Sequence, residues 1–306
     1  MIERVCVVGA GVIGSLFAGH LAQIADVSVL CRREEHARAL ETDGLRVSGK
    51  ADLSSRVRAA VSPDALPEPE LVVVATKANG LEAAAASLQG HWPAAAVMPV
   101  LNGLGAEEVV ARFGAWRVVS AVTFISGTKH SDTQVEYILD TETWVGPYGE
   151  TPLALAREAG ELIARSGLKV EVLDDLRPAQ WSKLIFNATV NGVAALTGLP
   201  HDFHFADEAE VWSLGRLVHA LVDEGKAVAR AARIELHDDP WEMNVLATRR
   251  GSAHFPSMLE DVESARPTEV ELINGALVRE ARRHGVAVPA HEAVYALVRG
   301  RESAYS

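Results

Sequence analysis

The feature that most constrains the fold is a glycine-rich turn close to the N-terminus. Residues 5–8 form the apolar run Val-Cys-Val-Val, which is typical of a buried strand, and Gly9-Ala10-Gly11-Val12-Ile13-Gly14 follows at once. A helical pattern comes next, and residues 27–30 form a second apolar run. Strand, glycine spacing and helix in this order predict a dinucleotide-binding unit, because the glycines let backbone N–H groups approach a pyrophosphate. The alternative is a glycine-rich turn without a ligand.

The residues after the second run bear on which dinucleotide is bound. An NAD site usually has an acidic residue there, which binds the ribose 2′-hydroxyl. This chain has Cys31, Arg32 and Arg33 instead, and Glu34 and Glu35 come late enough to suit the first turn of a helix. The arginines favour a 2′-phosphate, so we expect NADP as the cofactor, with Arg32 among its contacts. An exposed loop is the alternative for this pair.

Further apolar runs predict more strands of a parallel sheet. Residues 71–75 lead to Thr76-Lys77, and residues 95–101 lead to Asn102-Gly103-Leu104-Gly105. Ligands bind at the carboxyl edge of such a sheet, so we expect Lys77 to contact cofactor or substrate, although it could be an ordinary loop lysine. We also expect residues 134–139 and 143–146 to form an antiparallel pair that closes the sheet.

The pattern changes after residue 173. Residues 169–173 are the last predicted strand, and helical periods then continue nearly to the end of the 306-residue chain. We therefore expect two domains, an α/β Rossmann-type NADP-binding domain over residues 1–173 and an all-helical substrate and catalytic domain over residues 174–306.

A polar stripe opens the helical half. In Trp-Ser-Lys-Leu-Ile-Phe-Asn-Ala-Thr-Val-Asn-Gly at residues 181–192, the polar residues Lys183, Asn187 and Asn191 recur every fourth position. Positions four apart lie about 40° apart around a helix, so these side chains share one face. Between them stand apolar residues such as Leu184 and Ile185, which suit a core. Buried polar groups are costly unless they meet each other, water or a ligand. A solvated helix face is the alternative.

Charge and composition exclude several classes of partner. The formal net charge of −12 disfavours a general nucleic-acid or anionic-membrane binder, although a local basic cluster can still bind a small anion. We find no run long enough to span a membrane and no signal peptide, so we expect a cytoplasmic protein. The cysteines Cys6 and Cys31 suggest buried thiols in a reducing compartment. His201 and His204 lack the spacing of a helix-held metal site, so we expect no metal.

Together these segments resemble ketopantoate reductase, the 2-dehydropantoate 2-reductase family, over nearly the whole chain. The segments that carry the resemblance are GAGVIG at residues 9–14, TK at 76–77, NGLG at 102–105, WSKLIFNATVN at 181–191, SMLED at 257–261 and TEVELING at 268–275.

The resemblance implies a role for each matched residue. It implies that Lys183 is the general acid, that Glu269 assists catalysis, and that Lys77 and Asn102 contact the cofactor. It further implies that Lys183, Asn187, Asn191 and Ser257 hold the substrate, in the NADPH-dependent reduction of 2-dehydropantoate to (R)-pantoate for pantothenate and coenzyme A biosynthesis.

Two departures concern the substrate. Some members have an asparagine where this chain has His254 and a histidine where it has Leu101. A paralogue that reduces another branched 2-oxo acid is therefore the first alternative, and the others are a β-hydroxyacid dehydrogenase and a non-catalytic NADP-sensing protein. The expected partner is a small 2-oxo acid, and a homodimer is compatible with the sequence.

Two glutamates after Pro267 call for separate roles. With Thr268 as N-cap of a helix over residues 268–283, Glu271 stands at the third helical position and can bond back to the Thr268 N–H as a capping box. Glu269 is then left for the active site. The alternative for Glu269 is that it only complements the helix dipole.

Overall fold

The protein consists of two compact units. The computed structural model describes residues 1–249 and 255–305. One unit comprises Met1–Leu101 and Ala106–Leu176, and the other comprises Asn102–Gly105 and Arg177–Ser306. The division follows Leu176 instead of residue 173, and it assigns the four-residue NGLG segment to the helical unit.

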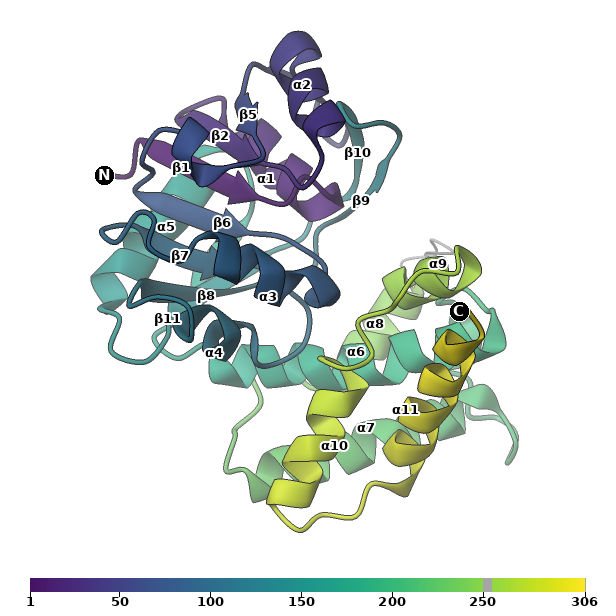
Figure 1. The fold of residues 1–306 in the computed structure, drawn as a ribbon. Helices are drawn as coiled ribbons and strands as arrows, with labels where there is room; N and C mark the ends of the chain where they lie inside the picture. Colours follow the sequence, from purple (N-terminus) through teal and green to yellow (C-terminus); the bar gives the residue numbers. More distant parts are fainter. Residues whose placement is uncertain (250–254, 306) are drawn as a thin grey trace. The chain divides into compact units, whose positions relative to one another are not determined.

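The first unit is built on a mostly parallel sheet (Figure 1). Within the described residues this sheet has eight strands in the order β12-β11-β8-β7-β6-β1-β2-β5. Only β11 runs against its neighbour β8 among these pairs. The strands are β1 (Arg4–Val8), β2 (Asp26–Leu30), β5 (Arg58–Ala60), β6 (Leu71–Val74), β7 (Ala96–Pro99), β8 (Arg117–Thr123), β11 (Thr143–Pro147) and β12 (Val170–Val172).

Helices cover both faces of this sheet, as the continuous apolar runs predict. Along β1, Val5 and Val7 pack with α1 (Val12–Leu21) and α5 (Leu153–Arg165) in one core cluster. Cys6 and Val8 point to the opposite face and pack with α3 (Ala78–Ser87) and α4 (Ala106–Ala111). Cys6 and Cys31 are buried free thiols. Helix α2 (Glu34–Asp43) packs against β5.

A smaller sheet completes the first unit. Its order is β4-β3-β10-β9, from β3 (Leu45–Gly49), β4 (Leu53–Ser55), β9 (Ser126–Lys129) and β10 (Gln134–Leu139). The expected antiparallel pair of residues 134–139 with 143–146 is therefore wrong. Strand β10 pairs with β9 and β3, whereas β11 pairs with β8. The reason is burial: Val135 and Tyr137 of β10 pack in the core beside α1, and β11 lies inside the main sheet between β12 and β8.

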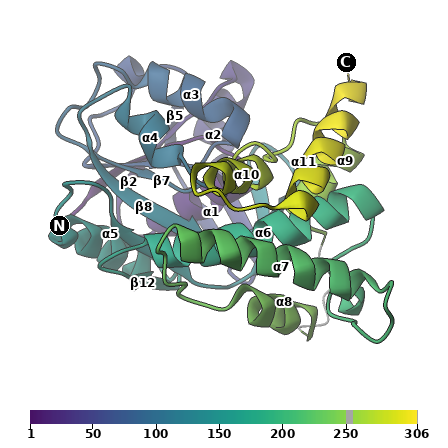
Figure 2. The same ribbon diagram turned by 90° about the horizontal axis from the view of Figure 1, so that it is seen from below.

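The second unit is organised around α6 (Arg177–Thr197), which packs against every other α-helix of the unit (Figure 2). These are α7 (Leu214–Ala231), α8 (Pro240–Arg249), α9 (Ser257–Glu263), α10 (Asn274–Arg283) and α11 (Pro289–Glu302). Residues 187–195 of α6 are buried without interruption, as expected of a helix that other helices surround.

Two contacts fix the middle of α6. The buried side chain of Asn274 donates to the Ala188 carbonyl oxygen at 2.7 Å. At Gly192, a Cβ would lie 2.5 Å from the nearest methyl carbon of Val294, so only glycine lets α11 pack this closely. The polar stripe is therefore carried by a helix that the other α-helices of the unit surround.

Candidate active site

The glycine-rich turn of the first unit has the geometry of a phosphate-binding loop. Gly9 follows β1 with a φ of +95°, which favours glycine. A Cβ at Gly14 would overlap the Gly9 carbonyl oxygen, so glycine is required for the helix to start here. Among the described residues, by contrast, nothing lies within 4 Å of a Cβ at Gly11. This part of the chain therefore imposes no steric need for glycine at position 11.

The residues of this turn fit a dinucleotide. Helix α1 starts at Val12 and its N-cap, Gly11, provides no side-chain cap. Among the described residues, the amides of Gly11, Val12 and Ile13 donate to no backbone carbonyl. Such unused N–H groups at a helix start bind anions, and an open side at Gly11 lets a pyrophosphate reach them. The predicted contacts from Gly9 to Gly14 thus lie together in one loop.

The arginines after β2 differ in their surroundings. Arg32 is exposed. Arg33 is the N-cap residue of α2, and its Nη2 donates to both carboxylate oxygens of Asp132 at 2.8 Å. Glu34 and Glu35 occupy the first turn of α2, as expected. No acidic residue stands at the end of β2. Asp132, in the β9–β10 turn, instead supplies a carboxylate that pairs with Arg33.

Lys77 stands where β6 ends and α3 begins. It is the exposed N-cap residue of α3, and its side chain makes no capping hydrogen bond. This places it at the carboxyl edge of the sheet, as the sequence predicts for a ligand contact.

The stripe residues of α6 are buried in the second unit. Lys183 is 6 % exposed, and Asn187 and Asn191 are each 7 % exposed. Burial lowers the pKa of Lys183 to about 7, against the opposing effect of the Glu269 carboxylate. Because a buried ammonium loses its hydration, the proton is held loosely enough to be donated near neutral pH. The prediction that these side chains share one face of a buried helix is confirmed.

A chain of hydrogen bonds connects the stripe to Glu269. The Asn187 side-chain nitrogen donates to Asn102 Oδ1 at 3.3 Å, and Asn102 Nδ2 donates to Glu269 Oε2 at 3.0 Å. Glu269 itself is 7 % exposed. Asn102 was expected to contact the cofactor, yet it belongs to the helical unit and binds two residues there. Its hydrogen bonds with Asn187 and Glu269 join residues that are far apart in the sequence, so residue spacing could not predict them.

The predicted capping box at Thr268 is wrong. Helix α10 starts at Asn274, and residues 270–273 form turns, so Thr268 caps no helix. The Thr268 N–H donates instead to Glu302 Oε1 at 2.6 Å. Glu271 lies on the surface, where it accepts from Arg279 at 2.7 Å and from Arg299 at 2.9 Å. Glu302, a distant residue, thus takes the place that Glu271 was expected to fill in the local cap. Glu269 and Glu271 still differ in their surroundings, because Glu269 is buried and Glu271 is exposed.

The other predicted substrate residues can be placed in part. Asn191 lies on the buried stripe one turn after Asn187, and among the described residues its side chain has no hydrogen-bond partner. Ser257 is the half-buried first residue of α9. Of the two departures from the family pattern, Leu101 is buried beside β7, and His254 lies outside the described residues.

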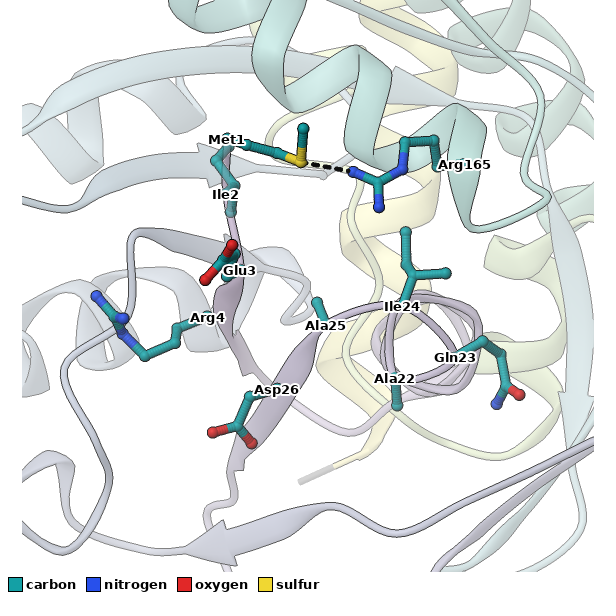
Figure 3. A pocket seen from close by; sticks show the side chains of 10 residues that line it. All are labelled: Met1, Ile2, Glu3, Arg4, Ala22, Gln23, Ile24, Ala25, Asp26 and Arg165. Atoms are coloured by element: carbon teal, nitrogen blue, oxygen red, sulfur yellow. Dashed lines mark hydrogen bonds between the residues drawn. The ribbon is translucent and has the colours of Figure 1, made fainter.

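A separate hollow of 560 Å³ lies at the amino ends of β1 and β2 (Figure 3). Its lining includes Glu3, Arg4 and Asp26, at the opposite end of these strands from the glycine-rich turn, and Arg165, the last residue of α5. It therefore shares no residue with the predicted site.

Two further expectations concern partners. Over residues 1–249 and 255–305 no group of three or more metal-ligating side chains gathers. His201 instead bonds Asn244 Oδ1 at 2.9 Å. In the same part of the chain, no helix has the length and apolar character needed to span a membrane.

Comparison with known proteins decides the family. The model for "Ketopantoate reductase PanE/ApbA" matches residues 5–150, and the model for its C-terminal part matches residues 175–302. The chain belongs to the ketopantoate reductase family. It is thus an oxidoreductase with a Rossmann-type dinucleotide-binding domain and a helical C-terminal domain, as the sequence predicts.

Relatives match this ketopantoate reductase family chain over nearly its full length. The 2-dehydropantoate 2-reductase of Archaeoglobus fulgidus is 29 % identical, covering 99 % of both chains, and that of Pyrococcus horikoshii is 27 % identical, covering 98 % of both. The crystal structure of a PanE/ApbA family ketopantoate reductase from Ralstonia eutropha is 27 % identical, with 99 % of both chains covered and a TM-score of 0.86. A D-mandelate dehydrogenase solved with NADH and anilino(oxo)acetate, 23 % identical with 99 % of both chains covered, has the same fold with a TM-score of 0.89.

The first prediction concerns the electrostatic link between Glu269 and Lys183. Glu269→Gln removes the carboxylate that raises the Lys183 pKa, so that pKa should fall below its value of about 7. With Lys183 as the expected proton donor, turnover should start to fall, as pH rises, at a lower pH than in the unmodified protein. The measurement is turnover against pH across the neutral range.

Glu271→Gln is the matched control, because Glu271 sits on the surface with Arg279 and Arg299. It should leave the pH profile unchanged and cost at most about 1 kcal/mol of unfolding free energy. A pH profile that shifts in Glu271→Gln and not in Glu269→Gln would reverse the assignment.

Proposed function

We propose that this ketopantoate reductase family member reduces 2-dehydropantoate to (R)-pantoate with NADPH, a step of pantothenate and coenzyme A biosynthesis. The observation that carries the proposal is the buried Lys183, whose pKa of about 7 makes it a proton donor at neutral pH. Its position in the family's WSKLIFNATVN segment, with Asn187 and Glu269 joined through Asn102, supports the same role.

The chemistry divides between the cofactor and the protein. Bound NADPH supplies a hydride to the C2 carbonyl carbon. Lys183 donates its proton to the carbonyl oxygen as negative charge develops there, and its positive charge stabilises that oxygen before the transfer is complete. Glu269 keeps Lys183 protonated at higher pH than burial alone would allow. Lys183 and Glu269 are thus the catalytic pair of the proposal.

The amides and a hydroxyl serve the substrate. Asn191 has donors and an acceptor to offer at a buried position, so it can bind hydroxyl and carbonyl oxygens without adding charge. Asn187 is held by Asn102, which fixes the orientation of its amide. The Ser257 hydroxyl can donate to the substrate carboxylate. We propose that Asn102 also orients the substrate-binding side chains, through its hydrogen bonds with Asn187 and Glu269, in addition to its expected contact with the cofactor.

The cofactor half of the proposal rests on the first unit. The loop from Gly9 to Gly14 binds the pyrophosphate through unused amides, and Lys77 at the sheet edge adds a cation. Exposed Arg32 binds the 2′-phosphate. Both arginines are exposed, but the Arg33 guanidinium is already paired with the Asp132 carboxylate, which favours Arg32 as the ligand of the 2′-phosphate.

A second candidate function is supported by one observation, the similarity of the fold to that of a D-mandelate dehydrogenase solved with NADH. Under it, the chain would act on an aromatic 2-oxo acid. Assays of the purified protein with NADPH and NADH against 2-dehydropantoate, a branched 2-oxo acid such as 2-oxoisovalerate, and benzoylformate separate the readings. The highest kcat/KM should be for 2-dehydropantoate with NADPH. The proposed substrate is wrong if another acid exceeds it by tenfold or more.

Replacement of the proton donor should affect chemistry more than binding. Lys183→Ala should lower turnover by roughly 10² to 10⁴, the range typical of a lost general acid, while the fold and the NADPH affinity persist. Steady-state kinetics, circular dichroism and NADPH titration provide the three readouts. Near-normal turnover in this variant would exclude Lys183 as the donor.

Replacement of Arg32 should change the choice of cofactor. The unmodified protein should strongly prefer NADPH to NADH, because Arg32 pairs with the 2′-phosphate that NADH lacks. Arg32→Ala should weaken NADPH binding by about tenfold or more and leave NADH binding nearly unchanged. Equal catalytic efficiency with both cofactors in the unmodified protein would contradict this assignment.

A further inference from the structure

Lys129 makes a contact that neither the motifs nor the proposed function accounts for. It is the last residue of β9, far from the glycine-rich turn in sequence, and its Nζ donates to the Ala10 carbonyl oxygen at 2.8 Å. Its side chain is only 25 % exposed. Both residues belong to the first unit, where β9 packs against α1.

The lysine is held in place by its neighbours. Its Nζ lies 3.3 Å from Asp132 Oδ1, and the same carboxylate binds Arg33. Although burial favours the protonated acid, the hydrogen bonds from Arg33 and Lys129 keep the pKa of Asp132 below its usual range. Burial and the neighbouring Lys129 lower the pKa of His36, and its neutral ring can donate from Nε2 to the Asp132 carbonyl oxygen at 2.9 Å. Asp132 thus contacts the Lys129 ammonium directly, Arg33 holds Asp132 in place, and His36 Nε2 lies 3.3 Å from Lys129 Nζ.

The bond to Ala10 also orients the next amide. A trans peptide is planar, so its C=O and N–H point in opposite directions. When Lys129 fixes the Ala10 carbonyl, the Gly11 N–H must point away from Lys129, and it donates to no backbone carbonyl among the described residues. The cation also polarises the peptide, which makes the Gly11 N–H a stronger donor.

We propose that Lys129 is a positioning residue of the dinucleotide site, which holds the Ala10–Gly11 peptide so that the Gly11 N–H is presented to the cofactor pyrophosphate. The inference rests on the proposed function, because it takes the glycine-rich turn to be the nucleotide site. It assigns to the β9–β10 turn a role in cofactor affinity that is separate from the 2′-phosphate contact of Arg32.

The separation gives a sharp test. The pyrophosphate is common to NADPH and NADH, whereas only NADPH carries the 2′-phosphate. Lys129→Met keeps the length of the side chain and removes its charge and its donor. This substitution should weaken the binding of NADPH and of NADH by about tenfold each. The ratio of the two affinities should stay unchanged within about threefold. Arg32→Ala should instead change the ratio.

The experiment is calorimetric titration of the whole protein with NADPH and with NADH, with a thermal melt of each variant. Lys50→Met is the matched control, because Lys50 is an exposed lysine next to β3 of the same small sheet, and it should change neither affinity. If Lys129→Met fails to fold, Lys129→Gln keeps a neutral donor to the Ala10 carbonyl and should show a smaller loss, again equal for both nucleotides.

The outcomes keep the two proposals apart. Unmodified protein that binds neither nucleotide overturns the proposed function. Unmodified protein that binds NADPH, with an unchanged affinity in Lys129→Met, overturns the role of Lys129 alone. A loss confined to NADPH overturns it too, since it would place Lys129 at the 2′-phosphate.

Discussion

Much of the structure depends on the burial of one ammonium group, that of Lys183. Removing a charged amine from water costs several kcal/mol unless it is paired or gives up its proton. Here both remedies act: burial lowers the pKa of Lys183 to about 7, and Glu269 partly opposes that fall. A carboxylate so deeply placed needs its own donors, and the Asn102 amide supplies one. Asn187, next on the stripe, donates to Asn102 in turn.

This requirement explains why a loop of the nucleotide-binding half is assigned to the helical unit. Asn102 can reach Glu269 only because the NGLG segment binds the backbone before α10. The Leu104 N–H donates to the Leu272 carbonyl oxygen at 3.1 Å. At Gly103, with a φ of +95°, a Cβ would overlap that same carbonyl oxygen, so glycine is required for the approach. The glycines of NGLG thus serve the placement of an amide beside a carboxylate.

The sequence predicts those parts of the fold and site that depend on local period and spacing. The glycine-rich turn, the buried face of α6 and the change from strands to helices are all of this kind, and they are confirmed. Contacts between distant segments are of another kind. The Thr268 capping box is wrong because Glu302 takes the Thr268 N–H, and the expected pairing of β10 is wrong because Val135 and Tyr137 complete a core beside α1. The hydrogen bond between Arg33 and Asp132 joins residues that are ninety-nine positions apart, so the sequence around Arg33 does not predict it.

The roles proposed for Lys183 and Lys129 differ because the surroundings of the two side chains differ. Around Lys183 the apolar helix removes water and one carboxylate only partly compensates, so the proton becomes available for transfer. Around Lys129 a carbonyl oxygen and a carboxylate lie within 3.3 Å, and both accept hydrogen bonds from an ammonium. The same side chain is then suited to hold a backbone carbonyl in place. Burial and the neighbouring groups, which the sequence position alone does not reveal, therefore distinguish a lysine suited to proton transfer from one suited to positioning.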